Sequence, residues 1–501
     1  MTAQTTAPLK AFNVVDGGLG EAARVGDHAI LTRDVPRHGA AELAADMAEV
    51  YAMALLRDVP FDAMTNPHHT VTIDGGTRFT LHELLCELRS LTWFDRSAVS
   101  FRDVDDTAFS RAGLGDEGHR RSLRWNGDGQ LTLRTLFRGG VACDGPAAPI
   151  SPLWSQGMRP SIRAALGTVP GEAAPMSEWI DWLDRTVGAD LPLPGHDAAP
   201  RCHVVTPRGL AEQVHTAHPG QIFFATALRM LGLGVGYDAG ISATPVLRRH
   251  WTAQRLLTLM CCAVRRATAL AQVRAGRTDR LSRPGVTAAR FAVMHARDDL
   301  HSGPDGVLLR AAIDELANAC PNLLHWVGRM NATTGDRTRI RETLHLPVMC
   351  EDGLPLHPSD GAAQALTAGA LVTVMKAVFD LPRHQPHLAT AAATGVDAAG
   401  LDRLAGDVAL GRIVAGGYYH AENHADLRMG EALGLQILRE ALEGDNLSAS
   451  IGFSGLDGQR HAISANPRAF RCGYASLRVD GDFTPWPADG RRGAAKLTAV
   501  V

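Results

Sequence analysis

The sequence predicts a mainly α-helical protein that carries a small β-hairpin near its C-terminus. Three observations support this fold class. Apolar residues recur at steps of three and four along most of the chain, the period of a helix with one buried face. Aromatic residues make up only 5% of the 501 residues while alanine is abundant, which favours closely packed helices over β-sandwiches. An Asp-Gly pair at residues 457–458 lies between two short apolar runs, as expected for a tight turn.

The predicted helices follow one another along the whole chain. Residues 41–56 place Leu43, Met47, Val50 and Ala54 on one face, the pattern of a helix that packs on a core. Similar apolar stripes predict helices at residues 81–91, 178–187, 210–231, 247–273, 287–295, 308–319, 362–379 and 426–442. The segment 247–273 is apolar around most of its circumference, so we expect a central helix there.

The remaining segments predict loops and one hairpin within a single domain. Pro and Gly concentrate at residues 139–175 and 191–200, which indicates long surface loops. Residues 448–453 and 459–463 are the expected strands of the hairpin. We therefore expect one unit over residues 1–501, made of an N-terminal helical half (1–240), a second helical half (241–445) and the C-terminal hairpin and tail (446–501).

Composition sets limits on partners and location. The formal net charge of −3 gives no reason to expect nucleic acid or an anionic membrane as a partner. The longest apolar run, at residues 256–264, is shorter than the roughly 20 residues that a membrane span needs. The first thirty residues hold no apolar stretch typical of a signal peptide. The 8 cysteines are scattered without a CxxC pair, which is typical of reduced thiols, so we expect a cytoplasmic protein.

Three polar segments lie among the predicted helices. Residues 280–284 (RLSRP) follow the central helix, residues 357–364 (HPSDGAAQ) open an apolar helix, and residues 411–420 (GRIVAGGYYH) precede another. Their order and spacing resemble the three anion-binding motifs of the vanadium haloperoxidases and the related acid phosphatases. In that family, Lys, Arg and a helix N-terminus hold vanadate, and one neutral imidazole bonds the metal.

The resemblance extends beyond these motifs, from about residue 45 to the C-terminal hairpin. Residues 50–61, 136–140 together with 145–152, 208–212 and 369–377 are similar to segments typical of the bacterial and algal branch of the family. The resemblance implies two helical bundles that form one compact unit, with the site between helices of the C-terminal half. It also implies a homodimer, as in bacterial relatives.

The departures from the family pattern concern the residues that hold vanadate. Tyr418 stands where the family has the vanadium-bonding His, Gln364 where it has the acid–base His, and Ala275 where it has the Lys. Ala362 and Ala363 replace the small residues that precede the second His. A neutral phenol is a weak ligand, and phosphatase chemistry needs the same His as nucleophile. The resemblance therefore implies a degenerate vanadate site, with no cofactor and no metal.

Other charged residues of the motifs are retained. Arg283 and Arg412 keep the family's arginine positions, and Glu422 stands where the family usually has Asp. Two buried guanidinium groups need partners, so we expect either Asp360 or Glu422, or a ligand oxygen, to pair with them. The alanine replacements would enlarge the cavity.

His420 and His424 also raise the question of a metal site. Histidines four residues apart share one helix face, which a zinc pair requires. Neither residue matches a metal position of the family, and the favoured interpretation is that both are solvated or locally hydrogen-bonded.

Vanadate-independent members of the family suggest a function. In actinobacterial meroterpenoid pathways they catalyse an α-hydroxyketone (acyloin-type) rearrangement, a 1,2-shift of a prenyl group on a naphthoquinone-like intermediate. By this resemblance the chain would be an isomerase of secondary metabolism that binds a small aromatic, prenylated substrate. Two alternatives remain open: a vanadium-dependent haloperoxidase in which His420 or His424 is a displaced ligand, and a non-catalytic binding homologue.

The resemblance implies a role for each candidate residue. Arg283 and Arg412 would stabilise charge on oxygen, and Tyr418 would act as general acid or base. Gln364 would orient a carbonyl, and Glu422 or His420 would relay the proton. The residues expected to line the substrate are Ser359, Asp360, Ala275, Ala363 and His424.

Overall fold

The structure is a computed structural model of the chain. It describes residues 38–94, 151, 153–154, 206–275, 280–296, 305–334, 343–346, 361–381, 396–468 and 473–487. The predicted helix at residues 178–187 lies outside these ranges.

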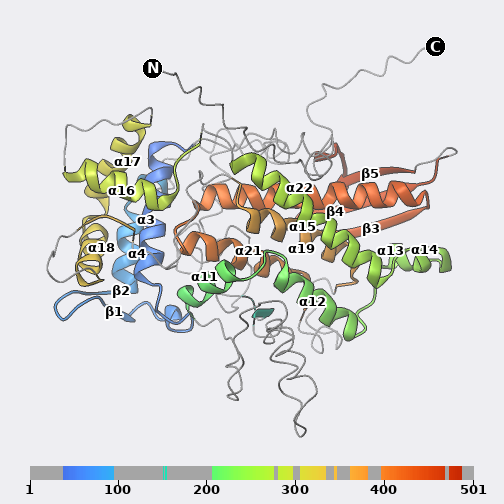
Figure 1. The fold of residues 1–501 in the computed structure, drawn as a ribbon, viewed down its shortest axis with the longest axis horizontal. Helices are drawn as coiled ribbons and strands as arrows, with labels where there is room; N and C mark the ends of the chain where they lie inside the picture. Colours follow the sequence, from blue (N-terminus) through green and yellow to red (C-terminus); the bar gives the residue numbers. More distant parts are fainter. Residues whose placement is uncertain are drawn as a thin grey trace, which may run out of the picture.

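A first group of helices surrounds α3 (Ala40–Leu55), which is buried along almost its whole length. The helices α17 (Gly306–Ala319) and α18 (Pro321–Thr334) pack against it, and α4 (Leu81–Arg89) and α16 (Pro284–Ala296) complete the group, at the left of Figure 1. A hairpin of β1 (Thr70–Thr72) and β2 (Arg78–Thr80) precedes α4, and two 3₁₀ turns occupy Ala63–Thr65 and Thr92–Phe94. These elements form one bundle around the N-terminal segment.

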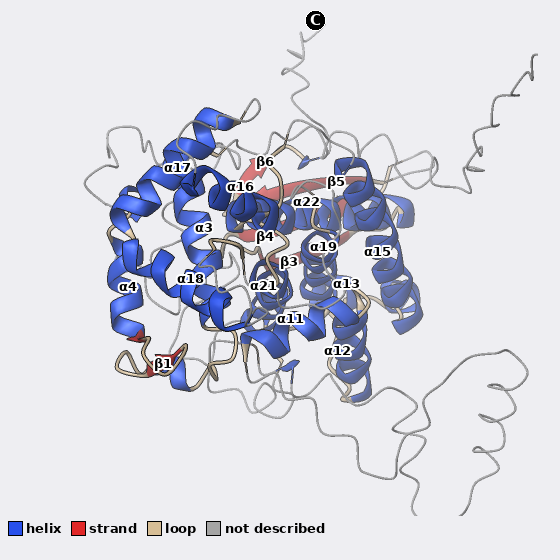
Figure 2. Cartoon of the chain, turned by 60° about the vertical axis from the view of Figure 1, so that its left-hand side comes forward, coloured by secondary structure: helices blue, strands red, loops and turns tan. Residues whose placement is uncertain are grey.

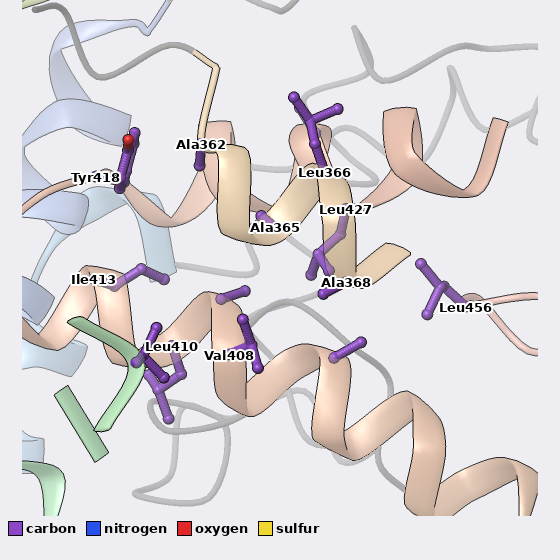
Figure 3. Close-up of a cluster of buried hydrophobic side chains, with 14 of the residues drawn as sticks. Ala362, Ala365, Leu366, Ala368, Val408, Leu410, Ile413, Tyr418, Leu427 and Leu456 are labelled. Atoms are coloured by element: carbon purple, nitrogen blue, oxygen red, sulfur yellow. The ribbon is translucent and has the colours of Figure 1, made fainter. Parts of the chain in front are cut away.

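A second group is built on the pair α19 (Ala363–Val378) and α22 (His420–Asp445), which α15 (Ala253–Ala275) and α21 (Ala398–Val414) flank. Glycines allow α19 and α22 to approach closely, because a Cβ at Gly369 would clash with the Leu427 carbonyl and one at Gly430 with the Leu366 carbonyl. Figure 3 shows the buried side chains of Leu366, Leu427 and their neighbours between these helices. The second bundle therefore has a tightly packed core.

Two predicted helices are interrupted. The segment 210–231 forms α11 (Pro207–Thr216) and α12 (Gln221–Gly232), separated at His218 and Pro219 because proline cannot continue a helix. The segment 247–273 forms α14 (Pro245–His250) and α15, separated at Trp251 and Thr252. A short helix, α13 (Ala239–Ser242), precedes α14.

The predicted hairpin is half of a larger sheet. β3 (Ala449–Ser454) and β4 (Arg460–Asn466) pair as expected, and Gly458 adopts a φ of +80° in their turn. β5 (Tyr474–Val479) and β6 (Asp482–Thr484) extend the antiparallel sheet in the order β3-β4-β5-β6. The sheet packs on α22 and α13 (Figures 1 and 2).

A charged cluster attaches this sheet to α22. Arg428 donates to Glu431 at 2.5 Å and contacts Asp457 at 2.9 Å, while the Leu456 amide donates to Glu431 at 2.8 Å. Because these groups come from both the helix and the β3–β4 turn, they fix the position of the hairpin.

Within the described ranges, α15 is long and apolar enough, by length and composition, to cross a membrane. In the structure it packs against α19 and α22, and its Arg266 and Arg274 are buried. The core helices of many proteins meet the same criterion.

Candidate functional site

The third sequence motif forms the turn between α21 and α22. Gly416 adopts a φ of +79°, and a Cβ there would clash with Leu346, so only glycine suits this position. The turn is closed by a hydrogen bond from the Gly417 amide to the Arg412 carbonyl at 3.0 Å. It places Tyr418 directly before Tyr419, the N-cap of α22, in the buried interior.

Two guanidinium groups lie against the ring of Tyr418. The Arg283 Cζ is 4.9 Å and the Arg412 Cζ is 5.7 Å from the ring centroid. Arg283 Nη2 also donates a long hydrogen bond, 3.5 Å, to the Tyr418 hydroxyl. Both arginines also approach Gly417, where a methyl group would lie 3.4 Å from Arg283 Nη1 and 3.8 Å from Arg412 Nη2. Arg283 and Tyr418, 135 residues apart in the sequence, are thus brought together.

The surroundings of these arginines are largely desolvated. Burial lowers the pKa of Arg283, an effect that contact with Tyr418 opposes, while the charges of Arg412 and Glu422 act in opposite directions. Arg412 is 4% exposed and lies 3.1 Å from His215 Nδ1 through its Nη1. Because a guanidinium can only donate, the His215 Nδ1 accepts this hydrogen bond. Among the described residues, Arg412 Nε has no hydrogen-bond partner, so one buried donor remains for another group.

The neighbouring Tyr419 holds the segment that carries Arg283. Its hydroxyl donates to the Ser282 carbonyl at 2.9 Å and shares a 2.5 Å hydrogen bond with Thr287. Burial raises the pKa of Tyr419 well above its ordinary value, so it stays a neutral donor. The two consecutive tyrosines therefore differ in role, since Tyr418 faces the arginines and Tyr419 positions one of them.

A buried ion pair that the sequence analysis missed lies behind Tyr419. His38 Nε2 is 2.9 Å from Asp46 Oδ2, and its ring centroid is 5.2 Å from that of Tyr419. Burial opposes the charged imidazolium, but the hydrogen bond and charge of Asp46 and the charge of Glu422 outweigh it and raise the pKa of His38 to about 9. A charged histidine eight residues from an aspartate, with no recognisable motif, gives no sequence signal.

In the second motif, a carboxylate from another helix of the chain accepts a hydrogen bond at the start of α19. Asp426 Oδ2 accepts from the Ala362 amide, the N-cap of α19, at 2.7 Å. Asp426 Oδ1 is 3.8 Å from Nε of Arg274, in the last turn of α15. Gly361 makes this possible, because its φ is +83° and a Cβ there would lie 2.8 Å from the Arg274 Cβ.

The structure adds two residues that the sequence did not single out. The buried cation beside the second motif is Arg274, one residue before Ala275, which is partly buried. The described carboxylate at this helix end is Asp426, whereas the expected pairing of Asp360 or Glu422 concerned Arg283 and Arg412.

The remaining predicted residues have varied locations. Ala363 and Gln364 are partly buried in the first turn of α19, and Ser359 and Asp360 lie outside the described residues. Glu422 is buried, and its charge acts on both Arg283 and His38.

The two histidines of α22 are buried, so the interpretation as solvated residues does not hold, and the interpretation as locally hydrogen-bonded residues stays open. His420 is 2% and His424 6% exposed, because the whole first half of α22 runs through the interior. Within the described part of the chain, no group of three or more His, Cys, Asp or Glu residues is arranged to hold a metal ion.

A cavity of about 340 Å³ lies away from this site, between α16, α17 and α18, where His295, His325 and Leu344 contribute to its wall. Ala362, which was expected to enlarge a cavity, is fully buried in the core shown in Figure 3.

Comparisons with known proteins agree with this architecture. The vanadium-dependent bromoperoxidases of Corallina pilulifera and Corallina officinalis are each 26% identical over 456 residues, or 80% of this chain and 70% of the relative. The solved structure of the second vanadate-dependent bromoperoxidase (AnII) of Ascophyllum nodosum, described as homohexameric, matches with a TM-score of 0.53 and 18% identity. That match covers 89% of this chain and 73% of the other. No family model matches the sequence.

These findings establish the fold. The predicted fold is confirmed: the chain has the mainly helical vanadium haloperoxidase fold with a small antiparallel C-terminal sheet. The sequence similarity to two vanadium-dependent bromoperoxidases supports a haloperoxidase-like family and an enzymatic ancestry.

Proposed function

We propose that this chain is an enzyme that works without vanadate and catalyses an α-hydroxyketone rearrangement, an intramolecular 1,2-shift. The observation that carries the proposal is the buried phenol of Tyr418 between the guanidinium groups of Arg283 and Arg412. A phenol can exchange a proton, and two fixed cations can stabilise negative charge on a neighbouring oxygen. Arg412 Nε, without a hydrogen-bond partner among the described residues, is a donor suited to that oxygen.

Three features argue against vanadate at this site. The residue in the place of the metal-bonding imidazole is the phenol of Tyr418. The Ala362 amide, at the start of α19, already binds the carboxylate of Asp426. The same carboxylate lies beside Arg274, so it would repel a multiply charged oxyanion. The donor set therefore fits a neutral ligand better than vanadate.

The proposed reaction needs no external oxidant or cofactor. The phenolate of Tyr418, formed when its own proton passes to the relay residue, takes the proton of a tertiary hydroxyl. The group on that carbon then moves with its bonding electrons to the adjacent carbonyl carbon. The hydroxyl-bearing carbon becomes a ketone, and the former carbonyl oxygen becomes an alkoxide that receives the proton. Arg283 and Arg412 stabilise the charge that passes between the two oxygens. Glu422, buried on the first turn of α22, is the proposed proton relay, with His420 as the alternative.

The proposed substrate is a prenylated naphthoquinone-like hydroxyketone. The site lies among apolar residues such as Ile413 and Ala362, which suit a hydrocarbon group (Figure 3). Gln364, at the start of α19, is the proposed contact to a carbonyl. A homodimer and a cytoplasmic location remain part of the proposal.

The test is turnover of an α-hydroxyketone of this class, followed by chromatography and mass spectrometry of the isomeric product. Tyr418→Phe keeps the ring against both arginines and removes the hydroxyl, so we expect a loss of about 100-fold or more in kcat. Arg412→Ala should be similarly impaired. Tyr474→Phe is the matched control, because Tyr474 is exposed on β5. Unchanged turnover in both site variants would exclude the assigned roles.

A second candidate, a vanadium-dependent haloperoxidase, is favoured by the similarity to the two bromoperoxidases. It would require His420 or His424 to replace the missing imidazole. The two candidates differ in one requirement, since only the haloperoxidase needs vanadate for activity.

A further inference from the structure

We propose that Asp426 is a built-in anion that occupies the chain's own oxyanion site and so restricts the ligand to neutral molecules. This inference deepens the proposed function, on which its choice of substrate class rests. It concerns a residue outside the three sequence motifs.

The location of Asp426 would otherwise suit a small anion. The amide of Ala362 lies at the N-terminus of α19, a 16-residue helix whose dipole favours negative charge at this end. Ala362 has no side chain that could cap the helix. The guanidinium of Arg274, which is 1% exposed, lies on the other side of the carboxylate. A backbone amide, a helix end and an arginine are the usual components of an anion site.

The carboxylate at the N-terminus of α19 belongs to a different helix, α22. Asp426 lies on α22, one turn after Glu422, and α22 packs along α19 through the glycine contacts described above. Asp426 is 0% exposed, so its charge is not screened by solvent. An entering phosphate or vanadate would have to displace it or share the site with a like charge.

The consequence is an asymmetric site. The half around Arg274 and Ala362 is neutralised internally, whereas the half around Tyr418 carries two arginines, and the charge of Glu422 acts on one of them, Arg283. Such a site favours a ligand that is neutral when it binds and develops negative charge on one oxygen during reaction. An α-hydroxyketone has this property and a free oxyanion does not.

The experiment measures the binding of inorganic phosphate by calorimetry to the full-length protein and its variants. Asp426→Asn retains an acceptor for the Ala362 amide and removes the charge. We expect it to bind phosphate about tenfold or more tightly than the unaltered protein, the effect of one like charge a few ångströms away. Equal phosphate affinity in the two proteins would overturn the proposal.

Two further variants make the result specific. Glu440→Gln removes the carboxylate that pairs with Arg266, so it also breaks a contact between α15 and α22, but away from the site. It should leave phosphate binding unchanged. The double variant Asp426→Asn with Arg274→Gln should lose the gained affinity, and retention of that affinity would contradict the assigned location.

If Asp426→Asn alone does not fold in chloride buffer, the comparison is the recovery of folded protein in phosphate and in chloride of equal ionic strength. Recovery that depends on phosphate supports the proposal, and equal recovery overturns it. None of these measurements uses the rearrangement, so failure of the proposed function would be recognised separately by the turnover assay.

Discussion

At the scale of single residues, the buried arginines of this molecule lie in two settings. Arg266 pairs with Glu440 and Arg274 with Asp426, whereas Arg283 and Arg412 lie around the phenol of Tyr418. A buried guanidinium donor is costly unless it has a partner, and Arg412 Nε has no hydrogen-bond partner among the described residues, so this donor marks the location proposed for a ligand oxygen.

The meeting of Arg283, Arg412 and Tyr418 could be predicted from the sequence because three motifs in a fixed order specify it. Arg274 could not, since an alignment without gaps places its neighbour Ala275 at the family's lysine position. The role of Asp426 could not be predicted either, because it depends on the packing of α22 on α19 and not on any local motif.

The buried pair of His38 and Asp46 leads to a prediction about pH. The folded-state pKa of His38, about 9, lies above the ordinary value of 6.5, so the pair contributes stability that is complete below about pH 6.5. This stability is lost as the pH rises through 9. Replacement His38→Gln should therefore flatten the fall in unfolding free energy between pH 6.5 and 9, measured by denaturant titration. A variant with the same slope as the unaltered protein would show that His38 is not charged in the folded state.

At the scale of elements, the contact between α19 and α22 depends on glycine. Gly430→Ala places a methyl group against the Leu366 carbonyl, and neither helix backbone can move without disturbing the core. We expect a loss of about 3 kcal/mol in stability, the upper part of the range for overpacking. Thermal and denaturant unfolding measure the change.

Gly444→Ala is the matched control for this prediction. Gly444 lies near the end of the same helix, and a methyl group there would meet nothing within 4 Å. This variant should be neutral or stabilised by up to about 1 kcal/mol, because alanine is the better helix former. Equal destabilisation of the two variants would refute the role assigned to the close approach.

Helices with a recognisable apolar stripe were predictable from the sequence. α16 and α17, each with one buried face, follow the predicted stripes closely, and α3 was also predicted although almost all of it is buried. α21 has no such stripe, because its residues from Leu404 to Val414 are buried without interruption. The breaks that separate α11 from α12 and α14 from α15 depend on a few residues that the apolar period did not reveal.

At the scale of the whole molecule, Asp407 joins distant parts of the chain. This buried residue of α21 accepts from the Ser151 amide at 2.6 Å and from the Trp154 indole at 3.0 Å. Burial raises its pKa to about 7, although these hydrogen bonds favour the charged form. The contact therefore titrates close to neutral pH.

The sign of this titration gives a second prediction about pH. Because the folded-state pKa is above the ordinary value of 3.8, the contribution of Asp407 is complete below about pH 3.8 and is lost as the pH rises through 7. The difference in unfolding free energy between the unaltered protein and Asp407→Asn should shift in favour of the variant over this interval. A difference that stays constant from pH 4 to 8 would be evidence against a neutral Asp407.

The most direct test of the central claim, that this haloperoxidase fold works without vanadate, is a bromination assay. Folded protein is incubated with peroxide, bromide and added orthovanadate, and the bromination of a β-diketone is followed spectrophotometrically. We expect no bromination that depends on vanadate, because Tyr418 replaces the imidazole and Asp426 occupies the anion site. Bromination that appears only with vanadate would contradict the claim and would indicate that a displaced histidine, His420 or His424, binds the metal.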